Sequence, residues 1–153
     1  MSEEIHFCRR AFQELSVAEL YELLRLRGDV FVVEQGVSEE NDVDGRDPEC
    51  VHVLGRDAQG DLVAAARMLM VDSPILVSRV VVREDARGRG VGTALMRTIE
   101  TYVGSCRAEM SAQAHLEAWY TRHGWVREGE VYDEVGIPHL KLVRPAGERP
   151  GEA

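Results

Sequence analysis

The sequence predicts a single α/β domain, and three observations lead to this fold class. The chain has 153 residues, of which 44% are hydrophobic and 29% charged, a composition typical of one globular domain with its own core. A β-branched run at residues 75–82 leads into a glycine-rich turn and then into a helical apolar pattern. Two further apolar runs, residues 51–56 and 62–70, flank a turn at residues 58–61 and indicate a β-hairpin.

The charge and the cysteines limit the classes of partner. A net charge of −9 argues against general binding to nucleic acid or to an anionic membrane; it suits a cationic partner, or it serves solubility alone. The cysteines are Cys8, Cys50 and Cys106, which are far apart and form no C-x-x-C pair, as expected for reduced thiols outside any metal site. The acidic start has no apolar signal region, and no apolar run approaches a membrane span. We therefore expect a cytoplasmic protein.

The first part of the chain predicts a strand followed by a capped helix. Residues 5–13 alternate loosely between apolar and polar and indicate a strand. Ser16 and Glu19 form a capping box, with Ser16 as the N-cap and Glu19 three residues later. The helix that begins there runs towards Phe31, and Gly28 weakens it.

An acidic segment follows that helix. Its six carboxylates fall within eleven positions and are Glu39, Glu40, Asp42, Asp44, Asp47 and Glu49. A calcium-binding EF-hand is excluded, because placing Gly45 at loop position six puts Val51 at position twelve, where a glutamate ligand is required. For most of these residues we predict a solvated loop. The alternative is that Asp42 and Asp44 hold the ammonium group of a substrate.

The second half of the chain predicts alternating helices and strands. A helix begins near Val91, with Leu95 and Ile99 on the same face and Gly104 at its end. We expect a strand at residues 107–113, a short helix at 115–123 that ends at Gly124, and final strands at 125–126 and 137–143. The predicted domain spans residues 1–145, and residues 146–153 form a flexible tail.

The turn between the strand at residues 75–82 and the next helix predicts a phosphate-binding site. Glycines at alternating positions leave room for a bulky anion, and the N–H groups at the helix start favour negative charge. The Walker pattern and the dinucleotide fingerprint G-x-G-x-x-G do not match. The alternative is a surface loop rich in glycine and arginine. The predicted pyrophosphate cradle consists of Arg87, Gly88, Arg89, Gly90, Val91, Gly92 and Thr93.

These motifs resemble the GNAT superfamily of N-acetyltransferases. The resemblance rests on the order of elements along the chain. A strand leads into the motif R-x-x-G-x-G, a helix and a second strand follow, and then come Tyr120, Gly124 and Trp125. Within the superfamily the chain is similar to the ElaA-type acetyltransferases, through residues 26–27, 30–35, 42–45, 112–116, 131–132 and 136–139. The first half also resembles acyl-homoserine lactone synthases, which pair an Arg, Phe and Glu helix with an acidic loop. These features correspond here to Arg27, Phe31, Glu34, Asp42 and Asp44, which we expect on the acceptor side.

The resemblance implies the fold and the acetyl donor. It implies a mixed, strongly twisted sheet that is flanked by helices and splayed at its fourth and fifth strands. It also implies acetyl-CoA as donor, with a homodimer as a common assembly. The strand that pairs with the pantetheine arm corresponds to Val80, Val81 and Val82. Gln113, which stands where relatives often have asparagine, and Tyr120 are also expected to contact the donor. Leu76 stands at the position of the glutamate base in histone-type members, so the resemblance assigns no base.

Five side chains of three kinds are candidates for acid–base chemistry. The resemblance places Tyr120 near the thioester sulfur, where a phenol could protonate the leaving thiolate; packing is the alternative. Glu34 follows four apolar residues and is a candidate base with a raised pKa, or else a surface glutamate. His52 is a second candidate base, or a hydrogen-bonded strand histidine. His115 and His139 have the same status, and we also expect them on the acceptor side.

Together these features predict an N-acetyltransferase. It would transfer the acetyl group of acetyl-CoA to a primary amine of a small molecule or peptide, by direct attack in a ternary complex. We expect the protein to use no metal and to bind neither nucleic acid nor a membrane. One alternative is acyl transfer like that of acyl-homoserine lactone synthases. The other is a non-catalytic acyl-CoA-binding or interaction module.

Overall fold

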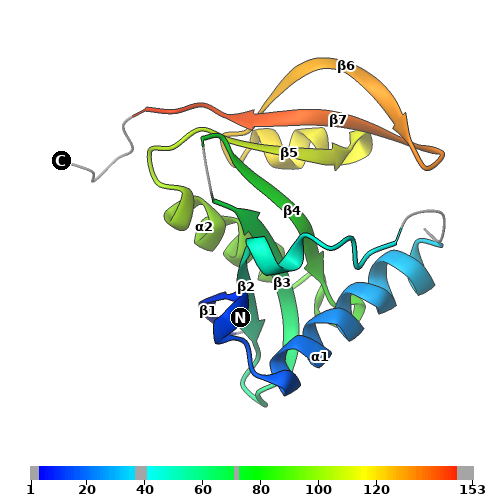
Figure 1. Ribbon diagram of the computed structural model, residues 1–153. Helices are drawn as coiled ribbons and strands as arrows, with labels where there is room; N and C mark the ends of the chain where they lie inside the picture. Colours follow the sequence, from blue (N-terminus) through cyan, green and yellow to red (C-terminus); the bar gives the residue numbers. More distant parts are fainter. Residues whose placement is uncertain (1–3, 37–40, 71–72, 148–153) are drawn as a thin grey trace.

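The protein folds around one mixed seven-stranded sheet with the strand order β1-β2-β3-β4-β5-β7-β6 (Figure 1). The computed structural model describes residues 4–36, 41–70 and 73–147. Its strands are β1 His6–Ala11, β2 Val51–Arg56, β3 Leu62–Leu69, β4 Ile75–Val82, β5 Ala108–Gln113, β6 Val126–Glu134 and β7 Ile137–Arg144. Its α-helices are α1 Val17–Arg27, α2 Val91–Val103 and α3 Glu117–Thr121. The predicted α/β class is confirmed.

The start of α1 follows the predicted capping box. The Ser16 hydroxyl accepts a hydrogen bond from the Glu19 backbone N–H at 3.0 Å, and the Glu19 carboxylate accepts one from the Ser16 N–H at 2.9 Å. The helix passes Gly28 without a break, because this glycine keeps right-handed helical angles. It continues as a π-helical turn, Gly28–Glu34, which is three residues longer than the sequence predicts. This π turn brings the end of the helical segment to the pocket described below.

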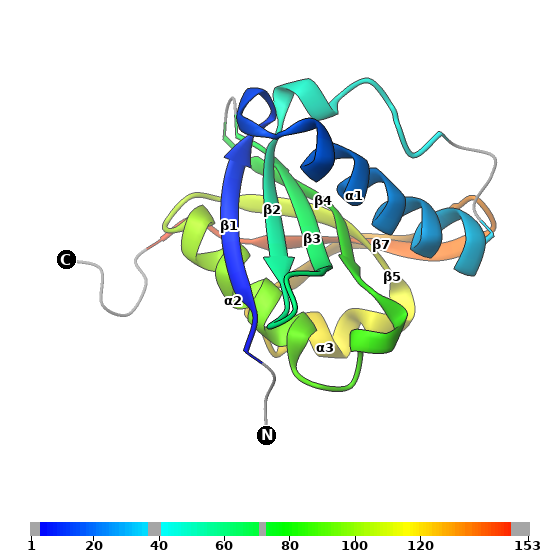
Figure 2. The same ribbon diagram turned by 90° about the horizontal axis from the view of Figure 1, so that it is seen from below.

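Helices cover both faces of the sheet (Figure 2). Val53 and Leu54 are neighbours on β2, so their side chains point to opposite faces. Leu54 packs in a cluster with Leu23 and Leu26 of α1. Val53 belongs to the larger core, which includes Val91, Leu95 and Ile99 of α2, Tyr120 of α3, and Trp125 just before β6. The apolar face predicted for the helix after the glycine loop is therefore the face that α2 buries.

The sheet is splayed between β4 and β5. These parallel strands pair only at Ile75 with Ala108 and at Leu76 with Glu109, after which they separate (Figure 1). On its other side, β4 stays paired with β3 and contains an irregularity where Arg79 has a φ of +53°. The splay at the fourth and fifth strands is confirmed, and among the described residues no strand pairs with the β5 side of β4 beyond Leu76.

The last two strands form a hairpin that is longer than predicted. Glu134 and Ile137 pair across a two-residue turn, in which Val135 and Gly136 both have positive φ, as a type I′ turn requires. The sequence prediction gave only residues 125–126 to the first strand of this hairpin. It missed the rest because β6 is an edge strand with charged residues on both faces, so it has no apolar alternation.

Two predictions fall partly outside the described residues. Glu39 and Glu40 of the acidic segment do so, as does the predicted tail from residue 148 onward. Within the described ranges, every helix is too short or too polar to cross a bilayer.

Candidate active site

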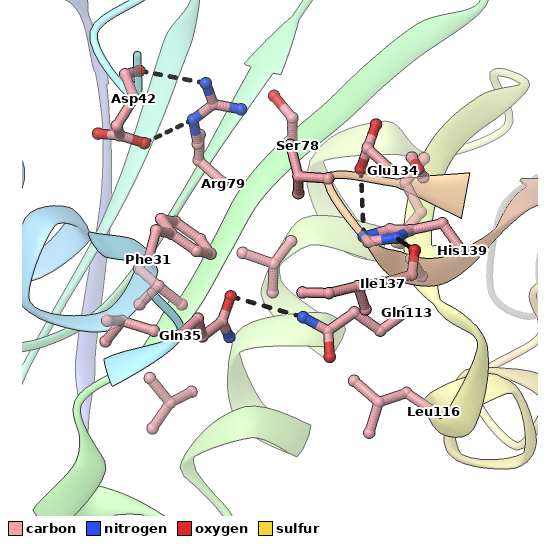
Figure 3. A pocket seen from close by; sticks show the side chains of 18 of the residues that line it. Phe31, Gln35, Asp42, Ser78, Arg79, Gln113, Leu116, Glu134, Ile137 and His139 are labelled. Atoms are coloured by element: carbon pink, nitrogen blue, oxygen red, sulfur yellow. Dashed lines mark hydrogen bonds and ion pairs between the residues drawn. The ribbon is translucent and has the colours of Figure 1, made fainter. Parts of the chain in front are cut away.

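A pocket of about 730 Å³ lies where β4 and β5 separate (Figure 3). One wall is β4 from Val77 to Val82, and the opposite wall is β5 from Met110 to Gln113. The π turn after α1 and the β6–β7 hairpin add further side chains. The predicted site residues that line the pocket are Phe31, Glu34, Asp42, Val80, Val81, Val82, Arg87, Gln113, His115, Tyr120 and His139. The pocket thus brings together eleven of the predicted site residues from both halves of the chain.

The glycine loop lies between β4 and α2 and has the form of a cradle. Gly88 and Gly90 have φ of +78° and +81°, and a Cβ at either position would meet no atom within 4 Å. Gly90 is the N-cap of α2, so the unpaired N–H groups of the first helical turn follow it directly. Val91 contributes only its backbone, because its side chain is buried in the core. Open space, left-handed glycines and free N–H groups fit an anionic phosphate group.

The arginine side chains of this loop are held by the protein itself. The Arg87 guanidinium donates a hydrogen bond to the carbonyl of Val82 at 3.0 Å. It also donates to both carboxylate oxygens of Glu34, with a distance of 2.8 Å to Oε2. Arg89 donates to the carbonyl of Asp85. The backbone of the loop, rather than the Arg87 side chain, is therefore the part that is oriented for a phosphate.

Glu34 corrects one prediction about the base. The hydrogen bonds from Arg87, with its charge, outweigh partial burial and hold the pKa of Glu34 below its usual value. The expected rise in pKa is therefore wrong. The apolar residues before Glu34 suggested burial, but the residue that decides its pKa lies 53 positions away in sequence.

His52 lies outside the pocket lining. Its ring is fully buried beside Phe12, and Nε2 lies 3.0 Å from the carbonyl oxygen of Asp47. Burial lowers the pKa of His52, so it stays neutral in the fold. The prediction of His52 as a base therefore conflicts with its position, and the alternative of a hydrogen-bonded strand histidine describes it.

Tyr120 lines the pocket from α3 and is almost completely buried. Its ring packs edge-on against Trp119, with ring centroids 4.9 Å apart. Burial raises the pKa of Tyr120 to about 12. The side chain thus combines the packing role and the pocket position that the sequence left as alternatives.

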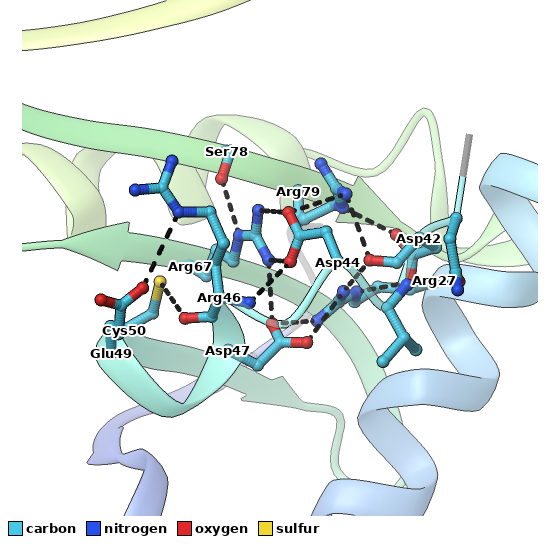
Figure 4. A network of polar contacts seen from close by, with 12 residues as sticks. Arg27, Asp42, Asp44, Arg46, Asp47, Glu49, Cys50, Arg67, Ser78 and Arg79 are labelled. Carbon is cyan, nitrogen blue, oxygen red and sulfur yellow. Dashed lines mark hydrogen bonds and ion pairs between the residues drawn. The ribbon is translucent and has the colours of Figure 1, made fainter.

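Three aspartates of the acidic segment belong to an ion-pair network rather than to a solvated loop, whereas Glu49 is exposed as predicted (Figure 4). Buried Arg27 donates to Asp42 at 2.9 Å and to Asp47 at 2.8 Å. Arg67 of β3 donates to Asp44 at 2.9 and 2.6 Å and to Asp47 at 3.1 Å. Arg79 of β4 donates to Asp42 at 2.7 Å. We call these six side chains, Arg27, Asp42, Asp44, Asp47, Arg67 and Arg79, the arginine–aspartate network.

This network corrects three predicted acceptor contacts. Arg27 is 1% exposed and its guanidinium is committed to aspartates, so it is not oriented towards an acceptor. Asp44 does not line the pocket, and Asp42 lines it with its charge already neutralised by two arginines. Neither carboxylate is available to an ammonium group. Arg67 and Arg79 were missed, although a lone arginine in each of two apolar strands is a signal that a buried anion must lie nearby.

The remaining polar side chains of the pocket come from β5 and the β6–β7 hairpin. Gln113 and Gln35 point towards each other across the pocket at 3.5 Å (Figure 3). His139 is nearly buried, with Nδ1 2.8 Å from the carbonyl oxygen of Ile137 and Nε2 3.1 Å from Glu134. The sequence prediction missed Glu134, because its role depends on the turn that brings it beside His139. Leu76, at the expected position of a glutamate base, is not among the lining residues.

Comparison with known proteins gives consistent matches. Residues 31–144 match the model of the acetyltransferase (GNAT) domain. Protein ElaA of Escherichia coli K12 is 43% identical over 140 residues, which cover 86% of this chain and 90% of that protein. The crystal structure of E. coli ElaA has a TM-score of 0.82 and covers 92% of this chain and 99% of its own.

Two further solved structures are similar. An acyl-CoA N-acyltransferase from Pseudomonas aeruginosa has a TM-score of 0.83 and 36% identity, over 92% of this chain and 99% of that one. An aminoglycoside 6′-N-acetyltransferase complexed with coenzyme A has a TM-score of 0.71 at 17% identity, over 94% of this chain and 99% of that one. The second of these shares only the fold.

Proposed function

Because this chain belongs to the GNAT acetyltransferase family, we propose that it transfers the acetyl group of acetyl-CoA to a primary amine by direct attack in a ternary complex. The observation that carries this proposal is the pocket between β4 and β5. The edge of β4 that is not paired with β5 lines this pocket, together with buried Tyr120 and the polar side chains of His139 and Glu134. A donor and an acceptor amine can therefore meet there without a covalent enzyme intermediate.

The donor half of the site is assigned to β4 and the glycine loop. Bound acetyl-CoA supplies an activated thioester. The N–H groups at the start of α2 and the turn at Gly88 and Gly90 bind its pyrophosphate. The free edge of β4 at Val80, Val81 and Val82 hydrogen-bonds the pantetheine arm, and one N–H of this edge stabilises the oxyanion. A likeness in fold to a structure complexed with coenzyme A supports this assignment.

The proposed acid is Tyr120. Burial raises its pKa to about 12, so the phenol is protonated throughout the neutral range and offers its O–H to the sulfur. This hydrogen bond stabilises negative charge as the carbon–sulfur bond breaks. The sulfur takes the phenol proton, and the phenol recovers a proton from the nitrogen that has formed the amide. The exchange leaves Tyr120 unchanged after each turnover.

Tyr120→Phe is expected to lower kcat by about 10²-fold while acetyl-CoA affinity changes little. We expect the kcat of the parent not to fall as the pH rises through the usual tyrosine pKa of about 10, because burial moves this titration to about 12. The measurements are steady-state kinetics against pH and calorimetry with acetyl-CoA. An unchanged kcat in the variant would make Tyr120 a packing residue, and an alkaline decline near pH 10 in the parent alone would contradict the effect of burial.

The test of the proposed function is acetyl transfer to a panel of primary amines. Cys106 is exposed, so thiol reagents report on the protein as well as on released CoA. Mass spectrometry of the acetylated product avoids this background. We expect at least one alkylamine or N-terminal peptide amine to be acetylated. Tight binding of acetyl-CoA with no product from any amine would instead indicate a non-catalytic acyl-CoA-binding module.

A further inference from the structure

His139 and Glu134 of the β6–β7 hairpin face each other in the pocket (Figure 3). Nδ1 of His139 lies 2.8 Å from the carbonyl oxygen of Ile137, and Nε2 lies 3.1 Å from a carboxylate oxygen of Glu134. A carbonyl oxygen only accepts hydrogen bonds, so Nδ1 must carry the proton. In the neutral ring Nε2 then has a lone pair directed at a carboxylate.

This geometry requires a proton between two acceptors. Two lone-pair groups 3.1 Å apart repel each other unless a proton lies between them. Either His139 carries a second proton itself, or a cationic N–H donor enters and donates to both groups. The second solution describes the ammonium group of an amine substrate.

The other carboxylates of the pocket are already paired with arginine. Among the described lining residues, Glu34 is bound by Arg87, and Asp42 is bound by Arg27 and Arg79. Glu134 contacts Nε2 of His139, which is charged only when the ring carries a second proton, and the Glu134 side chain remains 40% exposed. Of the carboxylates that line the pocket, Glu134 is therefore the one that an incoming cation can reach without displacing an arginine.

We propose that Glu134 binds the ammonium group of the acceptor and that His139 removes its proton. This inference rests on the proposed acetyl transfer and names the acceptor class as cationic primary alkylamines. The ammonium donates one N–H to Glu134 and one to Nε2, in place of the direct contact between the two side chains. An amine with its own carboxylate on the adjacent carbon is disfavoured, because that group would face Glu134.

The reaction then balances as follows. Nε2 of His139 takes one proton from the ammonium, and the freed electron pair of nitrogen forms a bond to the thioester carbon. The carbon–sulfur bond breaks, and sulfur receives the proton of Tyr120. The second nitrogen proton restores Tyr120, and His139 releases its proton to solvent. Amine, thioester and protein thus give an amide, a thiol and one proton.

Glu134→Gln tests the binding role with Glu130→Gln as the matched control. Glu130 is on the same strand, is exposed, does not line the pocket and loses the same charge on substitution. We expect Glu134→Gln to raise the KM for the best alkylamine of the panel by about 10- to 100-fold, the value of a hydrogen bond to a charged group. Its affinity for acetyl-CoA should match the parent, and Glu130→Gln should match the parent in both.

A binding experiment keeps the inference separate from the proposed function. Butylamine and spermidine are titrated calorimetrically into the complex of the protein with CoA, where no turnover occurs. Weaker binding in Glu134→Gln supports the site, whereas equal binding in both proteins, or none in the parent, overturns it. Failure to bind acetyl-CoA, or to acetylate any amine, counts instead against the proposed function.

His139→Asn tests the proton acceptor, because an asparagine amide still donates to the Ile137 carbonyl and lacks Nε2. We expect kcat to fall by about 10²-fold. The deficit should shrink with a fluorinated analogue of the same amine, which is less protonated at neutral pH and needs the base less. A deficit of equal size with both amines would assign His139 a structural role. A parent-like kcat would overturn its role as a base.

Discussion

Replacing Gly90 with glutamate is expected to abolish measurable binding of acetyl-CoA while the protein stays folded. Gly90 has a φ of +81° at the N-cap of α2, and the space at its Cβ position is empty. A glutamate side chain would place a carboxylate where the pyrophosphate is proposed to lie. Like charges brought together cost several kcal/mol, which corresponds to a loss of affinity of about 10³-fold or more. Calorimetry with acetyl-CoA measures the effect.

The matched control is Gly60→Glu. Gly60 also has a positive φ, +86°, and an open Cβ position, but it lies in the turn between β2 and β3. Both variants therefore suffer the same backbone strain and gain the same charge. Loss of binding in Gly90→Glu with parent-like affinity in Gly60→Glu locates the phosphate at the glycine loop. Similar affinities in the two variants would move the pyrophosphate elsewhere.

The parts of the site that the sequence predicted are those set by local rules. The glycine loop depends on neighbouring residues, because a strand end, glycines at alternating positions and a helix start form one continuous segment. The capping box at Ser16 and Glu19 is local for the same reason. Tyr120 is different, because its spacing alone favoured packing and only the resemblance to the GNAT family indicated a role in the site. It lines the pocket from α3, which follows β5 after a short turn.

The parts that the sequence could not predict depend on partners far along the chain. Glu34 was expected to be a base, but Arg87, 53 positions later, neutralises it. Asp42 was expected to bind a substrate cation, but Arg79, 37 positions later, binds it. No spacing rule relates such residues, because the splayed sheet decides which side chains meet. The net charge of a segment therefore does not reveal whether its carboxylates face solvent or arginines.

The arginine–aspartate network gives the acidic segment a structural role. It ties the loop after α1 to β3 and β4 through Arg67 and Arg79, next to the pocket wall (Figure 4). Asp42 and Arg79 belong to both the network and the pocket lining. The network therefore fixes one wall of the pocket, and the hairpin with Glu134 and His139 supplies the opposite wall with its polar groups.

Arg67→Met is expected to lower the free energy of unfolding by about 3 kcal/mol, with a fall in Tm of roughly 6–12 °C. Arg67 is 6% exposed and donates to Asp44, Asp47 and the Ser78 hydroxyl. Removing it takes one of two arginines from buried Asp47, which keeps Arg27, and leaves the partly exposed Asp44 with Arg79 alone. Breaking a buried ion pair on one side is strongly destabilising. Urea unfolding at neutral pH measures the loss.

The pH dependence of that loss identifies its cause. Hydrogen bonds from Arg67 lower the pKa of Asp44 despite its partial burial. Burial alone would raise the pKa of Asp47, but Arg27 and Arg67 together lower it below its usual value. A depressed pKa contributes stability above the unfolded value of about 3.9, and this contribution is lost as the pH falls through the folded pKa. The difference between the parent and Arg67→Met should therefore be full at pH 7 and shrink as the pH falls below about 4.

Arg46→Met is the control for Arg67→Met, because it makes the same substitution in a surface ion pair instead of in the network. Arg46 and Glu49 are each 57% exposed with their closest charged atoms 3.8 Å apart, so the same substitution there should change stability by less than about 1 kcal/mol. If Arg67→Met were as mild as Arg46→Met, the aspartates would be solvated and the first interpretation of the acidic segment would stand. If its loss stayed constant down to low pH, packing of the Arg67 stem rather than its charge would account for the effect, because an apolar contact does not titrate.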